Sequence, residues 1–295
     1  MDFISQFYPL LIPLAPFLVV VYSSVTIRKT GDNNYVIGVL LHAVAFLVAI
    51  VTLCQVAIEG VATRLILCET PWSFLPTIEL SIDRLSAVMM VVISGIGLVL
   101  YRYSIRYLQS ESGQPRYLTL LAMTISTLLV MVSSHDLVLL FLAWQLLSWL
   151  LCLLAYNYSH LPTARSSFRT FIMLRLGDVA FLAGIVLAYQ HYETLELSVL
   201  FERAETKAVT LQLFGTGLEI SGATAVAMLI FIGAMSKSAQ FPLHMWLPDS
   251  LFAPTPIHGL LHAGIINAGG FLLTRLAPLY MLSPPTLNFV FFVGL

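Results

Sequence analysis

The chain has 295 residues, of which 59% are hydrophobic and only 10% are charged, and its formal net charge is −1. Soluble domains carry a charge on roughly 25% of their residues. This composition therefore excludes a soluble globular enzyme, a disordered protein and a protein with a basic nucleic-acid-binding surface. It indicates a protein that crosses a membrane several times.

Eight apolar stretches are long enough for membrane-spanning helices, which need about 20 residues each. In chain order they are Phe3–Thr26, Tyr35–Ala57, Leu85–Tyr107, Tyr117–Val132, Leu137–Tyr156, Phe168–Tyr189, Ile220–Phe241 and Pro256–Leu276. A further apolar run, Leu287–Leu295, is too short to cross a bilayer. The expected fold is an all-α membrane protein with about eight transmembrane helices and the start of a ninth.

Two of the connections between these spans are long. Residues 59–84 alternate apolar and polar side chains around Ile78, Leu80 and Ile82. This pattern is typical of a strand and predicts a short hairpin at the membrane surface. Residues 191–217 interleave apolar side chains with glutamates, which predicts an amphipathic helix lying on the surface.

Basic residues in short loops favour the cytoplasmic side of a membrane. The loops that follow the odd-numbered spans hold seven basic residues, against five on the opposite side. These seven are Arg28, Lys29, Arg102, Arg106, Arg116, Arg165 and Arg169. The distribution predicts an N-terminus outside the cytoplasm.

The sixth span contains two charged residues, Arg175 and Asp178. A charge at the centre of a bilayer costs at least ~2.5 kcal/mol, so each needs a physical reason. Their spacing of three residues puts both on one helix face, where they can form an ion pair. Such a pair would either tune the electric field along a proton pathway or only fix the packing of the helices.

The seventh span contains Lys237, with no acidic residue within helical reach on the same span. Burial disfavours the charged form of a lysine, so such a side chain can take up and release a proton. Alternatively, Lys237 extends its ammonium group to the membrane surface. Pro242 follows closely and predicts a helix break of the kind that marks transport pathways, or an ordinary proline kink.

The eighth span carries His258 and His262 on one helix face. Two histidines at this spacing can bind zinc, but no third ligand follows at helical spacing, so we expect no metal site. A proton relay suits imidazoles, which titrate near physiological pH, and hydrogen bonds between helices are the simpler alternative. Gln145 in the fifth span can hold a water molecule or an amine, or only bridge two helices.

The sequence contains no nucleophile elbow, phosphate-binding loop or dinucleotide fingerprint. No enzyme motif therefore competes with other readings of the chain. Residues 236–249 (SKSAQFPLHMWLPD), 253–256 (APTP) and 261–263 (LHA) resemble the antiporter-like, proton-conducting subunits of respiratory complex I. The same family includes subunits of cation/proton antiporters and membrane hydrogenases. Residues 175–178 (RLGD) and 134–144 also match it. The resemblance implies a transport subunit without a cofactor rather than an enzyme.

This resemblance covers about residues 80–276 and implies an organisation of the chain. Residues 1–110 would form three N-terminal helices with a surface hairpin. Residues 111–278 would form the proton-conducting bundle, and residues 279–295 would begin a further helix. Family subunits resemble two inverted repeats, and only the first is present here. We therefore expect a missing segment or another chain to complete the second half-channel.

The resemblance also implies roles for individual residues. Lys237 matches the proton-carrying lysine of the broken seventh helix, His262 matches the relay histidine of the next helix, and His258 is an additional candidate. Asp178 matches the acidic residue of the sixth helix. Complex I subunits have a glutamate where this chain has Gln145, so their lysine–glutamate switch cannot operate here unchanged.

Residues 260–272 look most like the DabB branch, from bacterial inorganic carbon transporters. The DabA partner of such subunits is a large peripheral zinc-binding protein that resembles a carbonic anhydrase. The implied function is proton conduction across a bacterial inner membrane, driving uptake of carbon dioxide as bicarbonate by such a partner. The alternatives are a subunit of a complex I-like quinone oxidoreductase or cation/proton antiporter, and a scaffold that only anchors a peripheral enzyme.

Overall fold

The structure is a computed structural model that describes residues 7–26, 32–60, 63–68, 78–111, 113–156, 161–207, 209–212, 219–249 and 255–295. The expected start of the first span at Phe3, the basic residues Arg28 and Lys29, and residues 250–254 of the family motif lie outside these ranges.

Six continuous helices are long and apolar enough to cross a membrane, which confirms the first six expected spans. They are α2 (Leu11–Thr26, preceded by the 3-10 turn η1, Tyr8–Leu10), α3 (Asp32–Glu59), α4 (Arg84–Tyr107), α5 (Gln114–Ser133), α6 (Leu137–Ala155) and α7 (Leu161–Tyr192). The seventh span is the shorter α9 (Gly222–Lys237), and the eighth is the segmented helix Thr255–Arg275. The protein is thus an all-α membrane protein.

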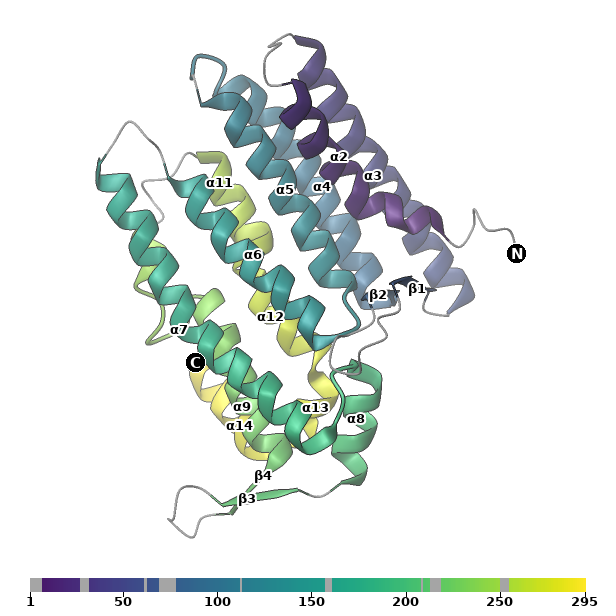
Figure 1. The fold of residues 1–295 in the computed structure, drawn as a ribbon, viewed down its shortest axis with the longest axis vertical. Helices are drawn as coiled ribbons and strands as arrows, with labels where there is room; N and C mark the ends of the chain where they lie inside the picture. Colours follow the sequence, from purple (N-terminus) through teal and green to yellow (C-terminus); the bar gives the residue numbers. More distant parts are fainter. Residues whose placement is uncertain are drawn as a thin grey trace.

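The helices form a continuous bundle in which chain neighbours pack side by side (Figure 1). Helices α2, α3, α4 and α5 pack against one another, α6 packs between α5 and α7, and α7 makes its largest contact with α9. Apolar side chains that face lipid remain exposed, and the buried ones form one core along all of these helices. The sequence pattern of near-continuous apolar stretches matches this arrangement, because both lipid and core favour apolar residues.

One end of the bundle carries the predicted surface elements, and we call it the hairpin end. Strands β1 (Thr63–Cys68) and β2 (Ile78–Ile82) pair antiparallel, which confirms the expected hairpin. Helix α8 (Leu197–Thr206) buries Leu197 and Leu200 against the bundle, which confirms the expected amphipathic helix. A second short pair, β3 (Thr210–Gln212) and β4 (Glu219–Ser221), was not apparent from the sequence pattern.

The seventh helix ends earlier than expected. We expected a span to Phe241, whereas α9 ends at Lys237 and the break occupies residues 238–245, before the short helix α10 (Trp246–Asp249). Ala239 takes a left-handed conformation at φ 51°, and Gln240 N donates to Met235 O at 2.9 Å. This geometry is a Schellman motif, which satisfies the last carbonyls of a helix without water. The break thus begins before Pro242, while the proline prevents the helix from resuming there.

The eighth helix is interrupted as well, although we expected one continuous span. Helix α11 (Thr255–Leu260) leads into a π-helical turn, η3 (Leu261–Ile265), and then α12 (Asn267–Arg275). The turn is marked by a hydrogen bond from Ile266 N to Leu261 O of 2.9 Å. Single π-turns are frequent at functional sites, and this one contains His262.

The last apolar run begins earlier than expected. Helix α13 (Ala277–Met281) is followed by α14 (Pro284–Gly294), whose first turn is capped by Ser283. Helix α14 packs against α9, where the rings of Phe231 and Phe289 meet edge to face at 5.7 Å.

Glycines set the distance between α7 and α9. A Cβ atom at Gly177 would collide with the side chain of Ser236, and one at Gly233 would lie 2.7 Å from Cβ of Phe181. Small residues let membrane helices approach closely, and dispersion contacts then stabilise the pair. The glycine between Arg175 and Asp178 is therefore required for the close contact that brings α7 to the end of α9.

We expect Gly177→Ala to destabilise the protein by about 1–3 kcal/mol, because α7 and α9 would have to separate. Gly270 is the matched control, since a Cβ there has no atom within 4 Å. Gly270→Ala should leave stability unchanged or raise it by up to about 1 kcal/mol through helix propensity. The thermal unfolding midpoint of the detergent-solubilised protein measures both, and a Gly177→Ala protein as stable as wild type would contradict the close-packing argument.

Candidate functional site: a buried lysine at a helix break

Lys237 is the last residue of α9, directly before the helix break, and its side chain is 0% exposed. Its Nζ donates to the carbonyl oxygen of Trp144 at 2.6 Å and to Oγ of Ser148 at 2.7 Å. Both partners belong to α6. The lysine therefore does not extend to the membrane surface, and its nitrogen lies in the seam between two helices.

Trp144 connects the lysine to the acidic residue of the next helix. Its ring lies under Lys237 Nζ, 4.6 Å from the ring centroid, and its indole Nε1 donates to Oδ1 of Asp178 at 2.8 Å. The ring is held edge to face against Phe181. A buried indole N–H needs an acceptor, and here the acceptor is the carboxylate of α7. The lysine and the carboxylate thus share one aromatic side chain.

Arg175 completes the cluster. Its Nη2 lies 3.0 Å from Asp178 Oδ2, which confirms the ion pair expected from the spacing of three residues. Its Nη1 donates to Oε1 of Gln145, and its guanidinium lies 4.7 Å from the ring centroid of Phe171. Gln145 therefore bridges α6 and α7 through Arg175.

The formal charges of this cluster depend on a single proton. Asp178 is 4% exposed and is already paired with Arg175, so these two charges cancel. With Gln145 neutral, a protonated Lys237 leaves the buried cluster at +1, and a neutral Lys237 leaves it at 0. An uncompensated charge is costly in a low-dielectric site. The proton on Lys237 therefore decides whether the buried cluster carries a net charge.

The two predicted histidines line a pocket of about 630 Å³ at the helix break. His258 and His262 line it together with His244, Phe241 and Leu247, among others. His262 is exposed, and the buried Nε2 of His258 has no hydrogen-bond partner among the described residues. No hydrogen bond joins these histidines to Lys237 within the described part of the chain. The structure thus separates the predicted residues into a lysine cluster and a histidine pocket.

Three residues at these sites were missed by the sequence reasoning. Trp144 and Ser148 lie next to Gln145 in the same span, and their spacing of four residues puts both on the helix face that meets Lys237. His244 lies in the break itself and lines the histidine pocket. Its position in the family motif was the available signal. Among the described residues, no three His, Cys, Asp or Glu side chains are grouped closely enough to hold a metal ion.

Comparisons with known proteins agree with this architecture. Residues 134–295, more than half of the chain, match the membrane domain family described as NADH:quinone oxidoreductase/Mrp antiporter, TM. Residues 72–118 match the N-terminal family of chain 5 of NADH-ubiquinone oxidoreductase, complex I. The class of protein is thus a multi-pass membrane subunit with a broken helix. The chain belongs to the antiporter-like family of complex I and Mrp membrane subunits.

Individual relatives are similar over different lengths. The chain is 38% identical to the probable inorganic carbon transporter subunit DabB1 of Halothiobacillus neapolitanus, over 97% of this chain and 49% of that protein. It is 36% identical to NADH-quinone oxidoreductase subunit L of Neisseria meningitidis, over 72% of this chain and 32% of that protein. A chain of the Mrp complex from Dietzia superposes with a TM-score of 0.75 at 26% identity, covering 91% of this chain and 28% of the other. The chain spans about half, or less, of the length of these relatives.

Proposed function

We propose that this chain conducts protons, with Lys237 as the group that carries them. The observation behind the proposal is the buried Lys237 Nζ, bound to neutral oxygens of α6 and linked to the Arg175–Asp178 pair through Trp144. When Lys237 Nζ binds or releases a proton, the net charge of the cluster changes by one, and no helix has to move. Arg175 and Asp178 set the field that Lys237 experiences, and Gln145 holds Arg175 in place.

The histidine pocket would connect this carrier to water. His262 lies in the π-turn of the eighth helix, beside His258 and across from the helix break. Imidazoles accept and donate protons near neutral pH, so these side chains suit a relay. The pocket lies at the helix break, since Ala239, Phe241 and His244 also line it, and in transporters such discontinuous helices line the pathway.

The proposed physiological role is the supply of proton-motive force for inorganic carbon uptake. Similarity to DabB1 over 97% of the chain supports this assignment. The membrane would be the bacterial inner membrane, with the N-terminus on the non-cytoplasmic side. The partner would be a large peripheral zinc-binding protein of the DabA kind, because hydration of carbon dioxide by zinc requires three protein ligands. A further segment or chain would complete the second half-channel.

Purification of the native complex through a tag on this chain tests the carbon-uptake role. We expect zinc to co-purify in about one equivalent with a large soluble-looking partner, and deletion of either gene to abolish growth at ambient carbon dioxide. The arginines Arg102, Arg106, Arg116, Arg165 and Arg169 lie on the proposed cytoplasmic side, where the partner would dock. Replacing these arginines by glutamine in pairs should weaken co-purification of the partner with this chain. Unchanged co-purification would indicate that the arginines act only as topology signals.

A proton-pumping subunit of a complex I-like quinone oxidoreductase is the second candidate. The 36% identity to subunit L of the Neisseria enzyme favours it. Iron–sulfur clusters and quinone reductase activity in the purified complex would support this candidate and contradict carbon uptake. Both candidates require proton conduction through Lys237, and a membrane scaffold requires none.

A further inference from the structure

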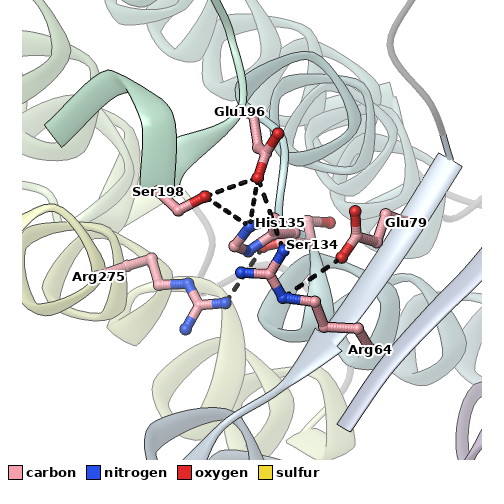
Figure 2. A network of polar contacts seen from close by, with 7 residues as sticks. All are labelled: Arg64, Glu79, Ser134, His135, Glu196, Ser198 and Arg275. Carbon is pink, nitrogen blue, oxygen red and sulfur yellow. Dashed lines mark hydrogen bonds and ion pairs between the residues drawn. The ribbon is translucent and has the colours of Figure 1, made fainter. Parts of the chain in front are cut away.

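Polar side chains from four parts of the chain converge at the hairpin end of the bundle (Figure 2). Arg64 of β1 lies 3.7 Å from Glu79 of β2 and 3.8 Å from Glu196, which precedes α8. His135 comes from the connection between α5 and α6, and Arg275 comes from the end of α12. None of these residues belongs to the lysine cluster or to the histidine pocket.

His135 and Glu196 form the centre of this network. Glu196 Oε1 lies 3.3 Å from His135 Nε2 and accepts a hydrogen bond from Ser198 Oγ at 2.6 Å. Backbone hydrogen bonds from Leu197 N to His135 O and from Leu137 N to Leu195 O join the two segments on either side. The connection before α6 and the connection before α8 are therefore held together as one unit.

Asp136 lies in this unit, paired through its backbone with Glu196. It is the N-cap of α6, and its Oδ1 accepts from Val138 N at 2.6 Å. Within the described residues, no ion pair joins it to a basic side chain. Its residue is 7% exposed, whereas the side chain of Glu196 is 39% exposed. A buried aspartate is thus paired through its backbone with a glutamate whose side chain reaches water.

Asp83 provides a contrast at the same end of the bundle. It is the N-cap of α4, and its Oδ1 accepts from Ser86 N at 2.9 Å, as a capping aspartate should. Its other oxygen, however, lies 2.6 Å from Nη1 of Arg275. The two aspartates share one structural role. Among the described residues, however, Asp83 is paired with a cation and Asp136 is not, and the side chain of Asp83 is also more exposed, at 39%.

This difference is reflected in the protonation of the two side chains. Burial raises the pKa of Asp136 to about 6, and the negative charge of Glu196 adds to the rise although backbone N–H groups oppose it. Burial also acts to raise the pKa of Asp83, but Arg275 and the hydrogen bonds with Ser86 outweigh it and hold that pKa below its ordinary value. Asp136 is thus protonated below about pH 6 and charged above it.

The side chains around Asp136 carry an excess of negative charge. The network holds four carboxylates (Glu79, Asp83, Asp136 and Glu196) and two arginines (Arg64 and Arg275), so the formal charges of these six side chains sum to −2. Glu79 is 9% exposed, and its buried Oε1, directed toward Arg64 in Figure 2, has no hydrogen-bond partner in the described part of the chain. A proton taken from water reduces this excess of negative charge.

We propose that Asp136, together with His135 and Glu196, is a proton-exchange site at the hairpin end of the bundle. A proton passes from water to the exposed Glu196 or to His135, and then to the Asp136 carboxylate. From Asp136 it either returns to water through the same side chains or moves along α6 toward Lys237. Helix α6 continues from Asp136 to Trp144, eight residues or about 12 Å deeper at ~1.5 Å per residue, where the Trp144 carbonyl binds Lys237. This inference rests on the proposed proton conduction and adds the place where protons meet water.

Asp136→Asn tests the site, because asparagine caps a helix as well as aspartate does but holds no exchangeable acid proton. The complex is reconstituted in vesicles, and proton flux is followed with a pH-sensitive dye from pH 5 to 8. Wild-type flux should change with a midpoint near pH 6, and Asp136→Asn should lose this transition and fall about tenfold in rate. That is less than the ~10²–10⁴ of a general acid–base group, because His135 and Glu196 remain.

Asp83→Asn is the matched control, since it is also a capping aspartate at this end. It should lower the thermal unfolding midpoint, because Arg275 loses its partner, but keep the pH transition of the flux. Infrared difference spectra provide a readout without transport: a carboxyl band that titrates near pH 6 should disappear in Asp136→Asn and persist in Asp83→Asn.

An unchanged pH profile or a persistent carboxyl band in Asp136→Asn would overturn the exchange site. If Lys237→Met stops the flux while Asp136→Asn leaves its pH profile unchanged, only this inference is wrong. If Lys237→Met leaves the flux intact, the proposed function itself is wrong.

Discussion

Replacing Lys237 with alanine or methionine is expected to abolish proton flux, by at least about 10²-fold, while the complex still assembles. The alkyl chain of methionine fills the space beside Trp144, so packing in the seam between α6 and α9 survives. What is lost is the only nitrogen of the cluster that can change its charge. Arginine at this position should fail as well, because a guanidinium does not release its proton.

Lys207→Met is the control for this experiment. Lys207 follows α8 at the hairpin end, and its Nζ donates to the carbonyl of His191 in an exposed contact. This replacement removes the same charge outside the site and should keep the flux within about twofold. Flux assays in vesicles, combined with co-purification of the partner subunits, measure both effects. Full flux in Lys237→Ala would contradict the assignment of Lys237 as the proton carrier and would favour the scaffold alternative.

The Arg175–Asp178 pair is expected to show the second large effect. Removing one partner of a buried ion pair leaves an uncompensated charge, which typically costs 3–5 kcal/mol. Because the side chain of Arg175 is 27% exposed, we expect about 3 kcal/mol for Asp178→Asn. The remaining guanidinium would also keep the cluster at +1 with neutral Lys237, so Lys237 would rarely load and flux should fall about tenfold or more.

The double variant Arg175→Gln with Asp178→Asn tests whether charge balance, rather than either side chain alone, explains the effect. It removes both charges, so the cluster again alternates between 0 and +1 as Lys237 loads. We expect it to recover most of the lost stability and part of the flux, while Arg175→Gln alone stays defective. Thermal unfolding of all four proteins yields the coupling energy of the pair. Additive effects of the two single changes would rule out the charge-balance argument.

A pair with one exposed partner provides the comparison for the stability measurement. Arg64 and Glu79 are 3.7 Å apart, and the Arg64 side chain is 54% exposed, whereas that of Glu79 is 12% exposed. Because the arginine reaches water and solvent screens its charge, Arg64→Gln should change stability less than Asp178→Asn does.

The sequence alone was sufficient for the bundle and for much of the site. Composition and apolar stretches of about 20 residues predicted the spans, because lipid requires apolar side chains and internally hydrogen-bonded helices. Spacing predicted the Arg175–Asp178 pair, since residues three apart share a helix face. The alternation around Leu80 predicted the surface hairpin. These are local properties, which neighbouring residues of one segment determine.

Only the tertiary structure decided where α9 ends and what Lys237 contacts. Helix α9 ends at Lys237 because a Schellman motif with left-handed Ala239 satisfies its last carbonyls. The pattern of apolar residues does not predict this motif. The partners of Lys237 come from α6, 89 and 93 residues away in the chain. Likewise, Asp83 and Asp136 are both capping aspartates. They differ because Arg275, 192 residues after Asp83, pairs with Asp83, whereas Asp136 is more deeply buried beside Glu196. Contacts between distant segments depend on how the helices pack, and packing is a property of the whole bundle.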